Sequence, residues 1–178
     1  MLQEIIFAGF GGQGVLLMGQ ILSLGALEQG NEVSWLPSYG PEMRGGTANC
    51  SVVISDTPIG SPLVLKPNAA VVMNQPSMEK FEDAITPGGV MLVNSSIIPL
   101  KAHREDITTH YVPCNAIAEE LGNAKVANVV MLGAYIGATG AVSFDAVMAA
   151  IRAKFAGKKA ALIEINEKAL RAGMDAVK

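Results

Sequence analysis

Short apolar runs alternate along this chain with longer segments in which apolar residues recur every three to four positions. The short runs predict buried strands, and the longer segments predict amphipathic or buried helices. The predicted strands cover residues 5–8, 32–36, 48–55, 69–73, 90–94 and 109–113. The predicted helices cover residues 14–29, 78–85, 115–121, 129–137, 144–155 and 162–178. Strands that alternate with helices in this way indicate an α/β fold with a largely parallel sheet.

Segment 48–55 departs from this rhythm because no helix separates it from the strand before it. Its residues alternate, with Cys50 and Val52 on one face and Asn49 and Ser51 on the other. A strand reached without a helical crossover is expected to be antiparallel or to lie at an edge. We therefore predict a single three-layer α/β/α domain over residues 1–178, with a mixed, mostly parallel sheet and a Rossmann-like beginning.

Three helix features are expected to matter for packing. The 129–137 segment is apolar nearly all round and carries the small residues Gly133 and Gly137, which predicts burial against another element. Ser77 and Ser143 are predicted N-caps of the helices that follow them. Asn128, the polar residue before the apolar segment, is either a cap or a ligand contact, and the cap is the favoured interpretation.

Charge and composition exclude several function classes. The formal net charge of −3 gives no basic field for nucleic acid. No apolar run approaches the roughly 20 residues that span a bilayer, and no signal peptide is recognisable, so a cytoplasmic location is expected. The two cysteines, Cys50 and Cys114, lie far apart and cannot hold an iron–sulfur cluster alone. Buried free thiols are expected instead.

Half of the residues are hydrophobic and only 16% are charged. A large interface with other subunits would explain so few charges, because obligate interfaces resemble a protein core. A core rich in small Ala and Gly side chains is the alternative explanation, and both can hold together.

A glycine cluster follows the first predicted strand and opens the first predicted helix. Gly9, Gly11 and Gly14 fit the pattern G-x-G-x-x-G, with Gly12 and Gln13 between them. Such a turn brings free N–H groups and the positive end of a helix dipole towards a ligand, and a phosphate or another anion suits it best. The alternative is that the glycines only permit tight packing of strand on helix.

A nicotinamide cofactor is a weaker prediction. In a dinucleotide-binding fold an acidic residue follows the second strand and holds the ribose hydroxyls. Here Ser34 to Ser38 occupy that place, and Glu32 stands at the beginning of the strand instead.

The second unusual segment, 37–47, contains two prolines and three glycines around a tyrosine, a glutamate and an arginine. Such a loop cannot be regular structure, and its mixed side chains favour a binding site over an ordinary turn. Arg44 offers a planar donor fork for a carboxylate or phosphate. The candidate binding residues are Gly9, Gly11, Gly12, Gln13, Gly14, Ser38, Tyr39, Gly40, Glu42, Arg44, Gly45, Gly46 and Asn128.

Together, the glycine turn and the Ser38-Tyr39-Gly40-Pro41-Glu42-Met43-Arg44-Gly45-Gly46 segment resemble the gamma subunit of 2-oxoacid:ferredoxin (acceptor) oxidoreductases. The resemblance extends to 128–133 and is strongest for the 2-oxoglutarate type or the branched-chain 2-oxoacid type. It implies a multisubunit enzyme that converts a 2-oxoacid and coenzyme A into an acyl-CoA and carbon dioxide, with reduction of ferredoxin or another acceptor.

The resemblance also implies where the cofactors lie. Thiamine diphosphate, magnesium and iron–sulfur clusters belong to partner subunits (alpha, beta and a ferredoxin-like delta), so this chain is expected to bind no cofactor and to be inactive alone. Contact with coenzyme A is one hypothesis for its glycine-rich loops. A purely structural subunit and an independent Rossmann-type nucleotide-binding protein are the alternatives.

Overall fold

The computed structural model describes residues 1–38, 47–158 and 160–178. These residues form a six-stranded sheet in the order β2-β3-β1-β4-β5-β6. The strands are β1 (Leu2–Phe10), β2 (Glu32–Ser38), β3 (Thr47–Ser55), β4 (Ala69–Val72), β5 (Val90–Asn94) and β6 (Thr108–Val112). β1, β4, β5 and β6 are parallel neighbours, whereas β3 runs antiparallel to both β1 and β2. The predicted mixed, mostly parallel sheet is therefore confirmed.

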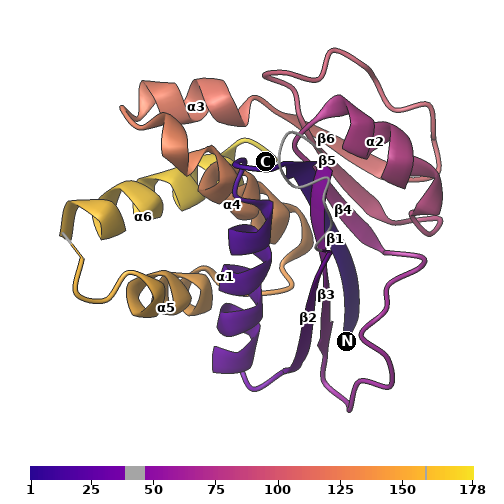
Figure 1. Cartoon of the computed structure of the whole chain (residues 1–178), viewed down its shortest axis with the longest axis horizontal. Coiled ribbons are helices and arrows are strands. Elements are labelled where there is room, and N and C mark those ends of the chain that lie inside the picture. Colours follow the sequence, from indigo (N-terminus) through magenta and orange to yellow (C-terminus); the bar gives the residue numbers. More distant parts are fainter. Residues whose placement is uncertain (39–46, 159) are drawn as a thin grey trace.

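Helices cover the two faces of this sheet unequally (Figure 1). Helices α1, α3, α4, α5 and α6 lie on one side, and α2 lies on the other. The helices are α1 (Val15–Glu28), α2 (Gln75–Phe81), α3 (Cys114–Glu120), α4 (Ala127–Thr139), α5 (Phe144–Lys154) and α6 (Ala160–Asp175), with short 3-10 helices η2 (Glu82–Ala84) and η3 (Ala124–Val126). None of the described helices is long and apolar enough to cross a membrane.

The two hydrophobic cores reflect this asymmetry. The larger core fills the space between the sheet and helices α1 and α3–α6, and it includes Phe7, Cys50 and Tyr135. The smaller core packs Met78 of α2 and Ile85 on β4 and β5. The third layer of the domain is thus a small one that covers only part of its face.

Strand β3 is antiparallel, as predicted, but it is an interior strand rather than an edge strand. Its Cys50 and Val52 face the large core, so a central position is compatible with its alternation. The edge is formed by β2, which continues through Pro37 to Ser38. Proline is tolerated in an edge strand, because one side of the strand needs no ladder hydrogen bond.

Helices α4 and α6 pack with their backbones in close approach. A Cβ atom added at Gly133 would collide with the Leu170 carbonyl, and one added at Gly173 would collide with the Val130 carbonyl. Gly137 is similarly close to Met174. The predicted packing role of the small residues in 129–137 is therefore confirmed.

The N-cap predictions were right at one position and wrong at two. Ser143 caps α5 by accepting a hydrogen bond from the Ala146 N–H (3.2 Å). Helix α2 begins earlier than predicted, and its cap is Asn74, whose Oδ1 accepts from the Ser77 N–H (3.0 Å). Pro76 in the first turn explains the earlier start, since its fixed φ suits that position. Asn128 is the second residue of α4 and not its cap.

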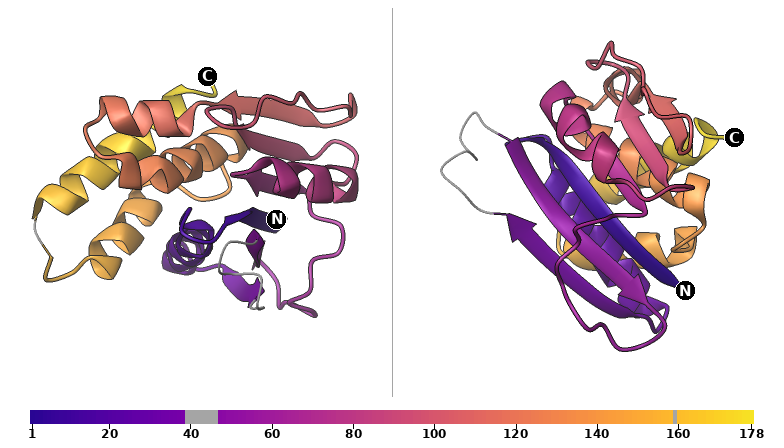
Figure 2. Two further views of the ribbon diagram at one scale, coloured as in Figure 1. Left: turned by 45° about the horizontal axis from the view of Figure 1, so that its top comes forward. Right: turned by 90° about the vertical axis from the view of Figure 1, so that its right-hand side faces the viewer.

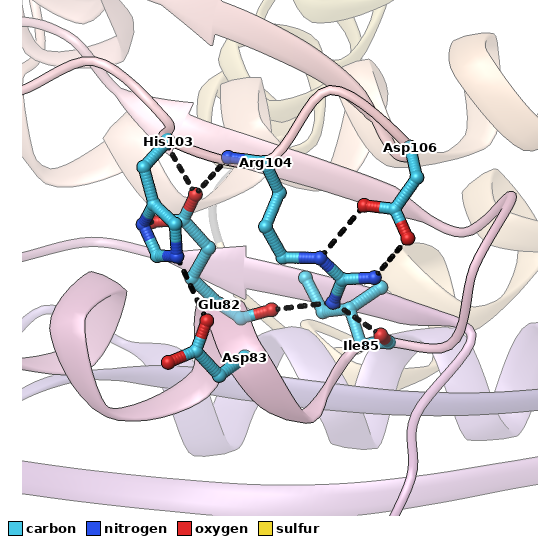
Figure 3. A network of polar contacts seen from close by, with 6 residues as sticks. All are labelled: Glu82, Asp83, Ile85, His103, Arg104 and Asp106. Carbon is cyan, nitrogen blue, oxygen red and sulfur yellow. Dashed lines mark hydrogen bonds and ion pairs between the residues drawn. The ribbon is translucent and has the colours of Figure 1, made fainter.

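A polar cluster joins η2 to the segment before β6 (Figure 3). The side chain of Arg104 is only 15% exposed. It donates hydrogen bonds to the carbonyls of Glu82 (3.0 Å) and Ile85 and to both carboxylate oxygens of Asp106. Arg104 thus ties the main chain of η2 and of Ile85 to the segment before β6, and the Glu82 carbonyl also accepts from the Ile85 N–H (3.3 Å).

Candidate ligand site at the glycine turn

The turn between β1 and α1 leaves its main chain accessible. Gly12 and Gly14 adopt left-handed φ angles of 93° and 75°, and the Gln13 N–H donates to the Phe10 carbonyl (3.1 Å). Gly11 and Gly12 are exposed, and a Cβ atom added at Gly12 would meet no atom within 4 Å. Glycine is required at position 12 by conformation rather than by crowding, since no atom of the described residues lies within 4 Å of an added Cβ.

The side chain of Gln13 ties the turn to the neighbouring strand. Its Oε1 accepts from the Phe10 N–H (2.6 Å), and its Nε2 donates to the Met73 carbonyl at the end of β4 (3.1 Å). A Cβ atom at Gly9 would come within 2.8 Å of the Met73 Cβ. Close packing therefore explains why position 9 is a glycine, and hydrogen bonds within the chain account for the side chain of Gln13.

Asn128 ties the same turn to helix α4. Its Nδ2 donates to the Gly14 carbonyl (3.3 Å), and its Oδ1 accepts from the Val129 N–H (3.0 Å). A Cβ atom at Gly14 would collide with this amide group. Glycine at position 14 is therefore needed for close approach as well as for its φ angle.

A cavity of about 140 Å³ opens beside the turn. Lys125 of η3 supplies its positive charge, and Asn115 supplies a further amide group. The lining residues are Gly12, Gln13, Met73, Asn115, Ala124, Lys125, Ala127 and Asn128. Three of the predicted site residues, Gly12, Gln13 and Asn128, are thus brought together, and Lys125 and Asn115 were not predicted.

The position of this cavity in the fold is typical of a binding site. It lies at the carboxyl ends of β1 and β4, which are parallel neighbours. The chain leaves β1 through α1 on one face and leaves β4 through α2 on the other (Figure 1). Open α/β sheets place ligands at such a switch point. A larger cavity of about 410 Å³ lies at the amino end of β1, and no predicted site residue lines it.

Asn94, the last residue of β5, supports the cavity wall from inside. It is fully buried, and its Nδ2 donates to the Met73 carbonyl (3.3 Å) and to the Asn115 Oδ1 (2.8 Å). Ser96 accepts from the N–H groups of Asn115 and Ala116 and so fixes the beginning of α3. Asn94 and Ser96 position the cavity-lining Asn115.

The second predicted loop cannot be placed in the same way. Ser38 is the last residue of β2 and pairs with Asn49 of β3. The other candidates in that segment lie outside the described residues: Tyr39, Gly40, Glu42, Arg44, Gly45 and Gly46.

The thiols do not favour a catalytic cysteine site, and the strand order does not favour a dinucleotide-binding site. Cys50 and Cys114 are free and buried, and burial raises the pKa of each thiol to about 12, so neither is a nucleophile near neutral pH. β3 separates β2 from β1, whereas the dinucleotide-binding sheet sets the second strand beside the first. Within residues 1–38, 47–158 and 160–178, no group of three or more His, Cys, Asp or Glu side chains could hold a metal ion.

A glycine turn at a strand–helix switch point, with a lysine-bearing cavity beside it, defines an α/β domain suited to an anionic group. The family model "Pyruvate ferredoxin/flavodoxin oxidoreductase" matches residues 4–176, and the chain belongs to this family.

Two relatives share 43% identity with the chain. One is a ketoisovalerate oxidoreductase subunit VorA of Methanothermobacter marburgensis, aligned over 97% of this chain and 36% of the relative. The other is a 2-oxoglutarate synthase subunit KorC of Methanocaldococcus jannaschii, aligned over 85% of this chain and 82% of the relative. The chain therefore spans only about a third of the VorA relative.

Two solved structures share the fold. A keto/oxoacid ferredoxin oxidoreductase gamma subunit of Geobacter sulfurreducens has a TM-score of 0.83 and 32% identity, and the match covers 98% of both chains. A 2-oxoglutarate:ferredoxin oxidoreductase of Magnetococcus marinus, with 2-oxoglutarate, coenzyme A and succinyl-CoA bound, has a TM-score of 0.89 at 22% identity. That match covers 99% of this chain but 31% of the other, and it shows the fold alone.

Proposed function

We propose that this chain is the gamma subunit of a multisubunit 2-oxoacid:ferredoxin oxidoreductase. The complex would convert a 2-oxoacid and coenzyme A into an acyl-CoA and carbon dioxide while it reduces ferredoxin or another acceptor. The observation that carries this proposal is the family match over residues 4–176, together with a gamma subunit of the same fold at 32% identity.

We propose that the redox cofactors are bound by other subunits of the complex. Thiamine diphosphate, magnesium and iron–sulfur clusters would be held by the alpha, beta and ferredoxin-like delta partners, and the complex would lie in the cytoplasm. The proposed substrate is 2-oxoglutarate. The branched-chain 2-oxoacids are the second candidate, because a ketoisovalerate oxidoreductase subunit is as similar as a 2-oxoglutarate synthase subunit.

For the chain itself we propose that the cavity at the glycine turn receives a phosphate of coenzyme A. The residues that would hold it are Lys125, by charge, and the main chain at Gly12, where an added Cβ would meet no atom of the described residues within 4 Å. The amino end of α1 adds the positive end of a helix dipole. A volume of about 140 Å³ suits a phosphate-sized group, so the rest of coenzyme A would lie outside this cavity.

A purely structural role remains the competing proposal, and one observation favours it. The amide groups of Gln13 and Asn128 are already engaged within the chain, with Met73 and Gly14 respectively. These two predicted contacts would then shape the turn without touching a ligand.

Steady-state kinetics of the reconstituted complex separates the two proposals. Lys125→Met removes the charge and keeps the length of the side chain, and the exposed Lys80 on α2 offers the matched control Lys80→Met. We expect Lys125→Met to raise the KM for coenzyme A about tenfold, with an unchanged KM for the 2-oxoacid, because a charge-assisted phosphate contact contributes about 1–3 kcal/mol. An unchanged KM for coenzyme A in an assembled complex would favour the structural role. Arg44→Ala extends the same test to the second loop.

A further inference from the structure

The wall of the cavity at the glycine turn contains three side-chain amides, those of Gln13, Asn115 and Asn128. An amide has an acceptor end and a donor end, so its direction decides which ligand groups it can bind. Lys125 contributes the positive charge of the wall, and no Asp or Glu of the described residues lines the cavity. The direction of the three amides therefore determines the remaining polarity of the cavity.

Main-chain donors engage the oxygens of Gln13 and Asn128. Gln13 Oε1 accepts from the Phe10 N–H (2.6 Å), and Asn128 Oδ1 accepts from the Val129 N–H (3.0 Å). A main-chain N–H can only donate, so neither amide can be reversed without the loss of this bond. Each NH2 group donates one of its two hydrogens to a carbonyl within the chain. Both amides therefore keep a donor in reserve, whereas their oxygens already accept a hydrogen bond.

The buried amide of Asn94 gives Asn115 the same polarity. Asn94 has one possible orientation, because its Oδ1 accepts from the Ser96 N–H (3.2 Å) and its Nδ2 donates to the Met73 carbonyl (3.3 Å). The same Nδ2 donates to Asn115 Oδ1 (2.8 Å), and the Cys114 thiol adds a weaker donor to that oxygen (3.7 Å). The oxygen of Asn115 is thus directed towards the interior of the domain.

The Nδ2 end of Asn115 is the end left for a ligand. In the left-hand view of Figure 2, the carboxyl ends of β5 and β6 point towards α3. Asn94, at the end of β5, is fully buried, whereas Asn115, the second residue of α3, is half-buried and lines the cavity. Within residues 1–38, 47–158 and 160–178, no group accepts a hydrogen bond from Asn115 Nδ2. Both of its hydrogens are therefore available in the cavity.

We infer that Asn115 binds the ligand of this cavity by donating from Nδ2 to a phosphate oxygen, and that Asn94 is the positioning residue that holds this donor towards the ligand. The inference rests on the proposed function, because it takes the ligand to be a phosphate of coenzyme A. Ionised phosphate oxygens only accept hydrogen bonds, so they match the donors of Lys125 and Asn115. An amine, which must donate, would find all three amide oxygens already engaged.

Asn115→Asp separates ligand binding from a structural role. One carboxylate oxygen can still accept from Asn94 Nδ2, so the contact that shapes the wall is kept, but the other oxygen replaces the donor with an acceptor. In steady-state kinetics of the reconstituted complex, we expect the KM for coenzyme A to rise about tenfold or more, because a hydrogen bond to a charged group is lost. The KM for the 2-oxoacid should not change. A merely structural Asn115 would tolerate aspartate, so an unchanged KM for coenzyme A would overturn the inference.

Two further variants control for the added charge. Asn115→Leu removes the donor without adding a charge, and it should raise the KM for coenzyme A about fivefold or more. Asn123→Asp puts the same charge near Lys125 but outside the lining residues, and aspartate can still accept from the Lys125 N–H. Its KM should change less than about twofold, because solvent screens an exposed charge. Equal rises in Asn123→Asp and Asn115→Asp would assign the effect to charge alone and contradict the inference. If Asn115→Asp does not fold, Asn115→Leu decides.

A double-mutant cycle tests the positioning role of Asn94. Asn94→Leu lets the Asn115 amide turn its oxygen to the cavity, and the KM for coenzyme A should rise about threefold or more. In a chain that already carries Asn115→Leu, the same change should leave this KM unaltered, because Asn94 acts only through that amide. Equal rises in both backgrounds would show that Asn94 acts through the fold and not through Asn115. If Asn94→Leu does not fold, the Asn115 variants decide alone.

Lys125→Met distinguishes a failure of this inference from a failure of the proposed phosphate contact. If Lys125→Met raises the KM for coenzyme A but both Asn115 variants do not, the phosphate binds without Asn115 and only the inference is wrong. If none of these variants changes the KM, the cavity receives no phosphate and both fail. If the wild-type chain forms no active complex, the proposed function fails, and titration of the full chain with inorganic phosphate tests Asn115 by itself. The NMR signals of its side-chain NH2 group should then shift, and unshifted signals would refute its role.

Discussion

Two amide side chains, Gln13 and Asn128, hold the glycine turn in its observed shape. Both are candidate binding residues, and both donate hydrogen bonds to main-chain carbonyls, at Met73 and Gly14. The main chain at Gly12 and the Lys125 side chain line the same cavity as these two amides. At the scale of single residues, shaping the turn and binding a ligand are separate tasks.

The Asn128 contact can be measured through stability. Asn128→Ala removes the donor to the Gly14 carbonyl, and we expect the free energy of unfolding to fall by about 1 kcal/mol, the usual contribution of one hydrogen bond. Chemical denaturation of the isolated chain provides the measurement. Lys125→Ala, at a neighbouring exposed position of the same cavity, serves as the control and should change stability by less than about 0.5 kcal/mol. An equal loss in both variants would show that the hydrogen bond is not the cause.

The two thiols give a prediction for reactivity and pH. Because burial raises the pKa of Cys50 and Cys114 from 9.0 to about 12, native chain at pH 8 should resist iodoacetamide, and unfolded chain should react at both positions. Intact mass measured before and after addition of guanidinium shows the difference. Rapid alkylation of either thiol in the native chain would contradict the assigned burial.

The same shift makes stability depend on alkaline pH. The folded pKa lies above the unfolded one, so this contribution to stability is complete below about pH 9. It is lost as pH rises from there towards 12, because the unfolded chain releases the thiol protons first.

At the scale of elements, the α4–α6 contact depends on glycines that allow two backbones to approach. Gly173→Ala adds a methyl group against the Val130 carbonyl and the Ala134 N–H. Helix propensity alone would favour alanine by about 1 kcal/mol. Overpacking should outweigh it, and we expect a net loss of about 2 kcal/mol in the free energy of unfolding. Gly60→Ala, where an added Cβ meets no atom within 4 Å, is the matched control. Equal stability of the two variants would contradict the close approach.

The Arg104 cluster is the other element-scale contact that can be tested. Arg104→Met keeps the length of the side chain but removes its hydrogen bonds to Glu82, Ile85 and Asp106 (Figure 3). We expect the Tm to fall by several degrees, because the Ile85 carbonyl and the Asp106 carboxylate lose their charged donor and the Glu82 carbonyl loses one of its two donors. Arg152→Met in the last turn of α5 should leave the Tm nearly unchanged, and calorimetry would record both.

Elements were predictable from sequence where local pattern decides them. The alternation of 48–55 and the missing helix before it predicted that this segment could be an antiparallel strand, and β3 is antiparallel to β1. The cap prediction at Ser77 was wrong although the signal is local, because Asn74 stands three residues earlier and Pro76 lies in the first turn. Lys125 and Asn115 were missed for a different reason. They join Gly12 only through the packing of η3 and α3 near the turn, and no spacing along the chain records that proximity.

At the scale of the whole molecule, the two faces of the sheet are covered unequally. Helices α1 and α3–α6 cover one face, whereas α2 and η2 cover only part of the other, and the side of β2 and β3 away from α1 carries Leu36 among small polar side chains. Under the proposed function, an interface with companion chains would account for part of the low share of charged residues, and the small Ala and Gly side chains of the core for the rest.

The central claim, that this chain completes a 2-oxoacid oxidoreductase, is tested most directly by reconstitution with and without it. The measurement is coenzyme A-dependent reduction of a viologen dye by the co-expressed companion chains, with 2-oxoglutarate, 2-oxoisovalerate or pyruvate as substrate. We predict turnover only when this chain is present, fastest with 2-oxoglutarate, and none by the chain alone. Full turnover by the companion chains without it, or turnover by the isolated chain, would contradict the claim.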